Sequence, residues 1–510
     1  MSDSLRSQSP ASASPKPLFP NVLQNIYKNL GPAFSTKAAP LTFPNPSLIA
    51  FNAELATELG LPHAAQSNAA QLFSGQQLLP GSSPVAQAYA GHQFGNFVPQ
   101  LGDGRALLLG ECVLPDGSLR DIQLKGAGPT PFSRRGDGRA ALGPVIREYL
   151  VSEALHALGI PTTRALAIVS TGDHIQRETQ QPGAILTRIA KSHIRIGTFE
   201  YFAARGDTDS LKILAEHVIA RHHPACNSFQ SADRYLTLLA QICAVQARLI
   251  AQWMRVGFIH GVMNTDNTTV SGETLDFGPC AFLDEYDPMK KFSYIDTRGR
   301  YAFANQPSIA FWNLTRLAEC LLPLCAKDPA DDIPEATAAL QTFQITYRQS
   351  YQQVQRSKLG LTSEHPDDEN LFNRLLGLMK DQRADFTRTF HSLIHAASPS
   401  GNPATPRLFV EIGDSPSARQ WLSDWLERLR HESLSTQARE QLMRDANPFI
   451  IPRNHRIEES IRAAEDHGDL SVFIELHAAL QKPQTEDPQT MPFAAPPTEE
   501  QKIQNTFCGT

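Results

Sequence analysis

The hydrophobic pattern of this chain changes from strand-like to helix-like at about residue 206, and this change restricts the fold class. From residue 102 to about residue 198 the pattern is mostly that of strands. Two apolar-rich runs, residues 106–114 and 119–125, flank the turn sequence Pro-Asp-Gly-Ser, which predicts an antiparallel hairpin. After residue 206 the apolar residues recur at helical spacing. The order predicts an α+β fold in which a strand-rich N-terminal lobe precedes a helical C-terminal lobe.

Further elements can be placed inside these two halves. Pro144 suits the first position of a helix that Gly159 and Pro161 end. The other expected elements are apolar segments at residues 163–169 and 184–189, a long helix at 232–256, and two short strands at 268–270 and 274–276 joined by Ser271-Gly272.

Four regions follow from this pattern and from local composition. Stretches rich in Ser, Pro and Glu bury too little apolar surface to fold, so both ends of the chain are predicted to be flexible. The predicted regions are a disordered N-terminus at residues 1–17, an N-terminal extension with the strand-rich lobe at 18–205, the helical lobe at 206–480, and a flexible tail with Cys508 at 481–510.

Composition argues against several classes of protein. The formal net charge of -6 and a pI near 6.2 speak against a nucleic-acid-binding surface spread over the molecule, so any cationic site must be concentrated. No run of about 18 apolar residues occurs and the start lacks the apolar stretch of a signal peptide, which predicts a cytoplasmic protein with no membrane segment. A Ser-rich, acid-poor start leaves a mitochondrial address as the alternative. The seven cysteines form no CxxC pair, so neither a zinc ribbon nor a disulfide framework is indicated.

A glycine-rich turn, a lysine and a glutamate follow one another in an order that suits phosphate binding. The turn is Gly102-Asp103-Gly104-Arg105, Lys125 closes the second strand of the hairpin, and Glu148 lies on the next helix. In kinase-type enzymes such a turn brings backbone amides to the phosphates, the Lys neutralises them, and the Glu orients the Lys. Each signal alone is weak, because a Gly-Asp-Gly is usually a plain turn and a strand-end Lys is usually solvated.

The stretch from His260 to Asn267, followed by Asp276-Phe277-Gly278, is more specific. It resembles the catalytic loop of protein kinases followed by their metal-binding motif. The kinase position for the catalytic Asp, two residues after the His, holds Val262, so Asp266 is the candidate for proton abstraction. Asn267 and Asp276 supply oxygen ligands suited to Mg²⁺, with Mn²⁺ as an alternative. The competing interpretation is an Asn/Asp-rich turn with a chance Asp-Phe-Gly.

Arginines gather around the same part of the sequence. Arg134-Arg135-Gly136-Asp137-Gly138-Arg139 forms a turn between the hairpin and the helix, and Arg188 and Arg195 lie in and just beyond a later strand. An isolated Arg is usually solvated, but guanidinium groups bind phosphate oxygens through a bidentate fork. In an acidic protein this cluster favours phosphate contact.

Several of these motifs together resemble the selenoprotein O family. The resemblance rests on Tyr89-Ala90-Gly91-His92-Gln93-Phe94-Gly95, Leu101-Gly102-Asp103-Gly104-Arg105, Leu124-Lys125-Gly126, Asn264-Thr265-Asp266-Asn267 and Ile451-Pro452-Arg453-Asn454-His455, and it extends from about residue 43 to residue 480.

This resemblance implies a protein-kinase-like bilobal pseudokinase fold that binds ATP in a reversed orientation. A Ser, Thr or Tyr hydroxyl of a protein substrate would then attack the α-phosphate, release pyrophosphate and become AMP-modified. Carried over by motif, Asp266 would be the base, Asn267 and Asp276 the metal ligands, and Glu148 a supporting residue. The implied ATP-binding residues are Gly102, Gly104, Arg105, Lys125, Asp137, Gly138, Arg188, Arg195 and Asp276. The resemblance also favours a monomer.

Some members of that family end in a short tail with selenocysteine, and the matching place here holds Cys508. The resemblance therefore suggests a redox pair between Cys508 and Cys280, which follows Asp276-Phe277-Gly278. The alternative is that Cys280 is a small buried apolar residue and Cys508 an incidental thiol.

Two rival functions remain at this point. A true kinase would move the γ-phosphate, and Val262 in place of the catalytic Asp speaks against it. A catalytically silent nucleotide-binding module is the second rival, and Asp266, Asn267 and Asp276 together speak against that, because such a module need not keep a base and metal ligands.

Overall fold

The computed structural model describes residues 22–61, 64–229, 231–325, 333–397 and 405–506. The predicted disordered N-terminus at 1–17 and Cys508 lie outside these described residues. The strands are β1 Ser35–Lys37, β2 Ser47–Phe51, β3 Val85–Gln87, β4 Gly91–Gln93, β5 Asn96–Val98, β6 Ala106–Val113, β7 Leu119–Lys125, β8 Ala140–Ala141, β9 Arg164–Gln176, β10 Gln180–Ala190, β11 Phe258–Ile259 and β12 Ala281–Phe282.

Helices dominate the chain after β10. They are α1 Ala53–Glu58, α2 Ala64–Ser67, α3 Ala69–Phe73, α4 Leu142–Ala157, α5 Ile196–Ala203, α6 Thr208–His222, α7 Ser231–Val256, α8 Gln306–Cys325, α9 Ile333–Lys358, α10 Asp368–Gln382, α11 Phe386–Ala396, α12 Thr405–Ile412, α13 Pro416–Arg430, α14 Thr436–Ala446, α15 Asn454–His467, α16 Ser471–Leu480 and α17 Met491–Ala494. The predicted α+β class, with strands first and helices after them, is confirmed.

An antiparallel sheet forms the N-terminal part of the molecule. Its strand order is β1-β3-β6-β7-β10-β9-β2, and β8 also pairs with β10. The predicted hairpin is present as β6 and β7, with Ala106 opposite Lys125. In β10, Arg188 lies opposite Gln123 of β7. Since paired residues point to the same face of a sheet and alternate residues share a face, Gln123, Lys125 and Arg188 all project from one face.

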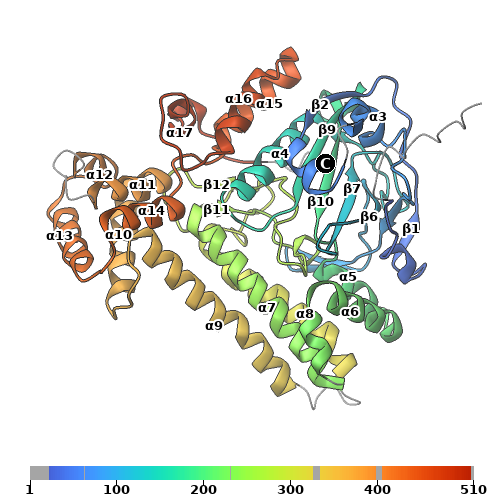
Figure 1. The fold of residues 1–510 in the computed structure, drawn as a ribbon, viewed down its shortest axis with the longest axis horizontal. Coiled ribbons are helices and arrows are strands. Elements are labelled where there is room, and N and C mark those ends of the chain that lie inside the picture. Colours follow the sequence, from blue (N-terminus) through green and yellow to red (C-terminus); the bar gives the residue numbers. More distant parts are fainter. Residues whose placement is uncertain (1–21, 62–63, 230, 326–332, 398–404, 507–510) are drawn as a thin grey trace, which may run out of the picture.

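Both faces of this sheet are covered (Figure 1). The face that carries Lys125 packs on α4, which contributes Ile146 and Leu150 to the largest hydrophobic core. The opposite face carries Leu124 and packs on α1 and α3 through a second group of apolar side chains that includes Phe73. Because α4 lies against the sheet, it brings Glu148 towards the strand that ends at Lys125.

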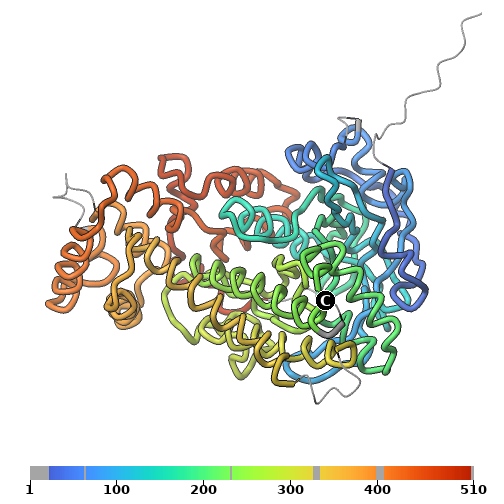
Figure 2. Tube along the Cα trace, turned by 60° about the horizontal axis from the view of Figure 1, so that its bottom comes forward, coloured from blue at the N-terminus to red at the C-terminus, as the bar shows by residue number. Residues whose placement is uncertain are grey.

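Long helices extend from the sheet and lead to a separate helical end. The three long helices α7, α8 and α9 pack on one another (Figure 1). Helices α10 to α14 form the end of the molecule opposite the sheet, coloured orange in Figure 2, around a core that contains Trp421 and Trp425. The chain then returns, and α15 and α16 pack on α4. No helix among the described residues combines the length and the apolar character that a membrane span requires.

The prediction of a two-stranded hairpin at residues 268–276 is wrong. Thr269 forms a bridge with Arg195, and Thr274 forms one with Thr162, so the two segments pair with other parts of the chain. The Thr269 hydroxyl closes the turn between them, donating to the Glu273 carbonyl and accepting from the Glu273 backbone N–H. These side-chain hydrogen bonds replace the backbone hydrogen bonds that a hairpin would form between the two segments. The backbone of each segment is then free to pair with another part of the chain.

Residues 481–506 differ from the flexible tail predicted for them. They include α17, and the Thr506 hydroxyl donates to the Pro279 carbonyl at 2.6 Å. The Phe449 N–H donates to the Pro483 carbonyl at 2.7 Å. A Pro-rich composition indicated disorder, but contacts with distant parts of the chain satisfy the backbone of this segment.

Candidate active site

Three charged side chains from the sheet and α4 form one buried cluster. Glu148 accepts from Lys125 Nζ at 2.5 Å through one oxygen and from Arg188 Nη2 at 2.5 Å through the other. Burial disfavours the charged carboxylate, but the charges of Arg188 and Lys125 outweigh this effect, so the pKa of Glu148 lies below its usual range. The glutamate therefore fixes two cations that can face phosphate.

Asp276 borders this cluster. Its Oδ1 lies 3.8 Å from Lys125 Nζ, and its backbone is left-handed, with φ of 69°. Burial would raise the pKa of Asp276, but Lys125, Arg188 and Arg105 together hold the pKa well below its usual range. Oδ1 is buried and has no hydrogen-bond partner in the described structure. A buried, ionised oxygen without a donor is a suitable ligand for a divalent cation.

The turn around Gly102 and Gly104 packs tightly. Gly102 has φ of 75°, and a Cβ there would lie 2.3 Å from the Phe132 ring, so only glycine fits. Between the two glycines, Asp103 accepts from Arg195 Nη1 at 3.3 Å and from Gln123. The Arg195 guanidinium also stacks over the Tyr89 ring, 4.1 Å from its centroid.

Asp266 is a buried carboxylate in the loop from His260 to Asn267, whose sequence resembles a kinase catalytic loop. Burial raises the pKa of Asp266 to about 7, although a hydrogen bond from Gln93 opposes the shift. Its Oδ1 has no hydrogen-bond partner in the described structure. A Cβ on Gly91 would lie 2.4 Å from that oxygen, so the glycine allows the loop and β4 to approach.

Asn267, the next residue, has a fixed orientation. Its Nδ2 donates to the Val262 carbonyl at 3.0 Å, which leaves Oδ1 as the acceptor end of the amide. His260 holds the same loop, since its Nε2 contacts the carbonyl of Leu275 at 2.8 Å. His260 thus ties the catalytic-type loop to the residue before Asp276.

A second group of polar residues supports Asp266 and was missed by the sequence analysis. His92 Nδ1 lies 2.5 Å from Glu200 Oε1, and the Thr265 hydroxyl donates to the other oxygen of Glu200 at 2.5 Å. The Thr265 hydroxyl also accepts from the His92 backbone N–H at 2.7 Å. The motif from Tyr89 to Gly95 marked this region, but Glu200 carries no signal of its own.

Other predicted residues lie in different surroundings. Asp137 is exposed and forms a two-point ion pair with Arg177 at 2.9 Å, and this hydrogen bonding lowers its pKa. Gly138 has φ of 67° and packs on Gly128, where a Cβ would lie 2.1 Å from the carbonyl oxygen. The structure therefore joins Lys125, Glu148, Arg188 and Asp276 directly, whereas Asp137 is held on the turn by Arg177.

Cys280 is fully buried, and its thiol donates to the Phe277 carbonyl at 3.1 Å. Burial raises the pKa of the thiol to about 12, which favours the unreactive protonated form. The pairing of Cys280 with Cys508 stays a prediction, because Cys508 lies outside the described residues.

Comparison with known proteins assigns a family to this arrangement. The family model described as "Protein adenylyltransferase SelO" matches residues 18–481. A protein nucleotidyltransferase YdiU from Rhizobium rhizogenes is 53% identical over 494 residues, covering 96% of this chain and 97% of the relative. A second YdiU, from Rhizobium johnstonii, is 49% identical over 511 residues and covers 100% of both chains. A third, from Agrobacterium fabrum, is 52% identical over 488 residues, covering 95% and 99%.

Proposed function

The chain belongs to the SelO family of protein adenylyltransferases, and we propose that its charged cluster binds ATP so that AMP passes to a Ser, Thr or Tyr hydroxyl of a protein substrate. We further propose that the sheet and the helical part are the two lobes of a kinase-like fold with ATP in the reversed orientation. One observation carries the proposed chemistry: the buried carboxylate Asp266 lies in the catalytic-type loop, whereas Val262 fills the usual kinase position.

The cations around Glu148 support the binding of phosphates. Lys125 and Arg188 are both paired with Glu148, and Arg195 is held by Asp103. Fixed cations in a buried site stabilise negative charge strongly, because they need no reorganisation when that charge develops. The glycines at 102 and 104 would let backbone amides approach the nucleotide, and Arg105, Asp137 and Gly138 would contact it from the turns.

The metal ligands proposed are Asn267 and Asp276. The unpartnered Oδ1 of Asp276 and the amide oxygen of Asn267 fit a hard cation such as Mg²⁺, with Mn²⁺ as the alternative. When bound, such an ion neutralises phosphate charge and helps to orient the α-phosphate.

Asp266 is the proposed base. The substrate hydroxyl passes its proton to the Asp266 carboxylate, and its oxygen forms a bond to the α-phosphorus. The bond between that phosphorus and the bridging oxygen breaks, and pyrophosphate leaves with the electron pair. A carboxylate whose pKa is near 7 suits this task, because it is partly ionised at neutral pH and accepts a proton readily.

Labelled ATP tests the proposal. Purified protein is incubated with Mg²⁺, a protein acceptor and ATP labelled at either the α- or the γ-phosphate, and labelled protein is followed by gel and intact mass. We expect α-label on protein, lost in Asp276→Ala and kept in Asp414→Asn, an exposed aspartate on the far helical end. Retention of γ-label would indicate a kinase instead, and ATP binding without any label would indicate a silent module.

A further inference from the structure

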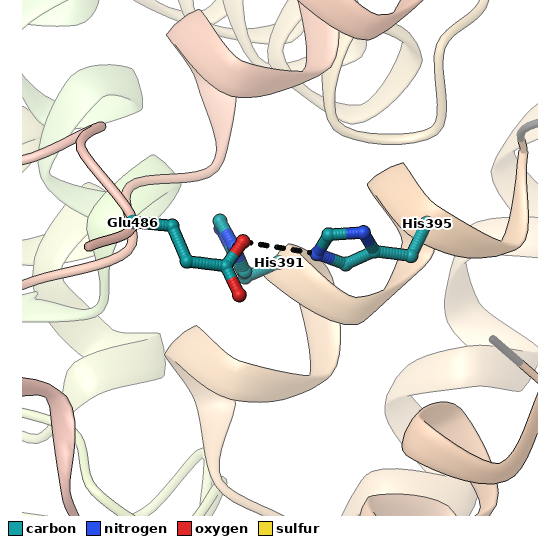
Figure 3. A group of neighbouring side chains, drawn as sticks. All are labelled: His391, His395 and Glu486. Carbon is teal, nitrogen blue, oxygen red and sulfur yellow. Dashed lines mark hydrogen bonds and ion pairs between the residues drawn. The ribbon is translucent and has the colours of Figure 1, made fainter. Parts of the chain in front are cut away.

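Two histidines on α11 and a distant glutamate come together outside the proposed catalytic site. His391 and His395 are four residues apart on the helix, so their side chains share a face. Glu486, from the segment before α17, reaches the same place (Figure 3). Its Oε2 lies 3.3 Å from His391 Nε2 and 3.1 Å from His395 Nε2. The three ligand-type atoms all lie within 4.8 Å of one another.

The hydrogen bonds of His391 indicate which of its nitrogens carries hydrogen. Its Nδ1 lies 3.4 Å from the Asn447 carbonyl oxygen, which can only accept, so Nδ1 is the donor. In a neutral imidazole Nε2 is then a lone-pair acceptor, yet it faces the acceptor Oε2 of Glu486. Such a contact needs either a proton on Nε2, as in the imidazolium form, or a metal ion between the two atoms.

His395 is in the same situation. Arg407 Nη1 lies 3.2 Å from His395 Nε2, and a guanidinium can only donate, so this nitrogen also offers a lone pair. The two Nε2 atoms and the carboxylate oxygen therefore converge to within 4.8 Å of one another. This convergence is the arrangement that a metal ion requires of its ligands.

We propose that His391, His395 and Glu486 form a zinc-binding site. Two His nitrogens and one carboxylate are a known zinc ligand set, with bonds of about 2.0–2.2 Å. Tetrahedral bonds of that length place ligand atoms about 3.3 Å apart, which agrees with the 3.1 and 3.3 Å contacts of Glu486 Oε2. Nitrogen ligands disfavour Mg²⁺, so this site differs in metal from the one proposed at Asp276.

The site is accessible from solvent and has space for a fourth ligand. The side chains of His395 and Glu486 are 27% and 25% exposed. The three residues line a cavity of about 400 Å³ whose wall also includes Val410, Phe449 and Met491. Three protein ligands next to an open cavity leave a coordination position for water or an exogenous anion.

Arg407 is the cation nearest to the ligand atoms, and its Nη1 would have to give up its contact with His395 Nε2 when zinc binds there. Arg407 Nη1 lies 3.1 Å from Oε1 of Glu486, the oxygen that does not face the histidines, so it can orient the carboxylate while Oε2 binds zinc. Arg388, which also lines the cavity, is paired with Glu411 at 2.6 Å. A bound ion would therefore link α11 to residues 481–506 while Arg407 stays paired with Oε1 of Glu486 and Arg388 with Glu411.

Zinc binding by matched variants tests the proposal. The full chain is dialysed against chelator, then titrated with Zn²⁺ in excess Mg²⁺, and bound metal is measured by elemental analysis. His395→Gln and Glu486→Gln each remove one ligand. The control is His431→Gln, because His431 is an exposed histidine of the same helical end, at the C-cap of α13. All four proteins keep the catalytic residues, so any difference reports this cluster.

We expect wild type and His431→Gln to hold one more zinc per chain than the two ligand variants, with at least tenfold weaker binding in the variants. Wild type loaded with Co²⁺ should show the intense visible absorption of tetrahedral coordination and lose it when Zn²⁺ is added. Equal zinc binding by all four proteins would overturn the proposal and leave an ion cluster of His391, His395, Glu486 and Arg407. If a variant does not melt cooperatively, its zinc binding cannot be compared with that of wild type, and the Co²⁺ spectrum of wild type alone tests the site. A weak spectrum typical of octahedral coordination would overturn the proposal.

Discussion

Asp266 differs from an ordinary aspartate because its surroundings favour the protonated form. Burial raises its pKa to about 7, so the residue is largely protonated at pH 6 and largely ionised at pH 8. A general base acts only when it is ionised. We therefore expect kcat/KM for AMP transfer to rise with pH through about pH 7 and then to level off.

The variant Asp266→Asn should lower kcat by roughly 10²–10⁴-fold, because that is the usual contribution of general base catalysis. It should also abolish the rise of kcat/KM with pH through about pH 7. The measurement is the pH profile of α-label incorporation for both proteins, with binding of ATP checked separately. A wild-type profile that stays flat from about pH 6 to pH 8 would remove Asp266 as the base.

Glu148 allows a second prediction, because α4 supplies a matched control. Glu148 pairs with Lys125 and Arg188, whereas Glu153 on the same helix pairs with Arg164 at 2.8 Å, on the side of β9. Both carboxylates are buried, so Glu→Gln at either position removes the nearest partner charge of an arginine, either the buried Arg188 or the partly buried Arg164, and should lower the melting temperature.

Only Glu148→Gln should also misplace Lys125 and Arg188, and a misplacement of about 1 Å can cost about 10²-fold in rate. Activity is compared at a temperature at which both variants are folded. Equal activity losses in Glu148→Gln and Glu153→Gln would mean that the loss reflects stability and not the site.

Among the helices and strands, the sequence correctly predicted those that are determined by nearby residues. The hairpin β6–β7 follows from its turn residues and the two apolar-rich runs beside them, and α7 from a long helical periodicity that ends at Gly257. The strands expected at 268–270 and 274–276 pair elsewhere, since their partners, Arg195 and Thr162, are distant in sequence. Segments of three residues have too little pattern to identify a partner.

The same distinction applies to the candidate site. Lys125, Glu148 and Asp276 could be predicted as candidates because their order along the chain is that of a known catalytic arrangement, and Asp266 because it lies next to Asn267 in the loop. Glu200 and Glu486 could not, because each acts through residues about 65 to 108 positions away. Nothing in the local sequence of a single glutamate indicates such a partner.

The turn at Gly102 gives a prediction at this scale. Its φ of 75° is unfavourable for alanine, and a Cβ would lie 2.3 Å from the Phe132 ring. Gly102→Ala should therefore shift the turn between β5 and β6 and weaken ATP binding, which calorimetry measures, by at least tenfold.

The control for this turn is Gly117→Ala in the β6–β7 turn, where φ is 80° but no atom lies within 4 Å of the added Cβ. It carries the same backbone strain, of about 1 kcal/mol, without the clash. Unchanged ATP affinity in Gly102→Ala would show that this turn does not contact the nucleotide.

For the whole molecule, Arg453 joins three distant parts of the chain. It is 1% exposed and pairs with Asp284 at 2.5 Å, just after β12, and with Asp385 at 2.8 Å, at the start of α11. Its Nε donates to the Ala494 carbonyl of α17 at 3.1 Å. One guanidinium therefore connects the strand after Asp276, the helical end and residues 481–506.

Removal of this charge leaves the buried Asp385 and the partly buried Asp284 without their partner charge, and breaking a buried pair typically costs about 3–5 kcal/mol. We expect Arg453→Met to lower the free energy of unfolding by that amount, as measured by denaturant titration. Arg456→Met, three residues further along α15, removes an ion pair with the half-exposed Glu459 and a hydrogen bond to the Pro492 carbonyl, and should cost less, about 1–2 kcal/mol. A small loss in Arg453→Met would mean that Asp284 and Asp385 become protonated or find other donors. The three parts would then be held together by their apolar contacts and not by this arginine.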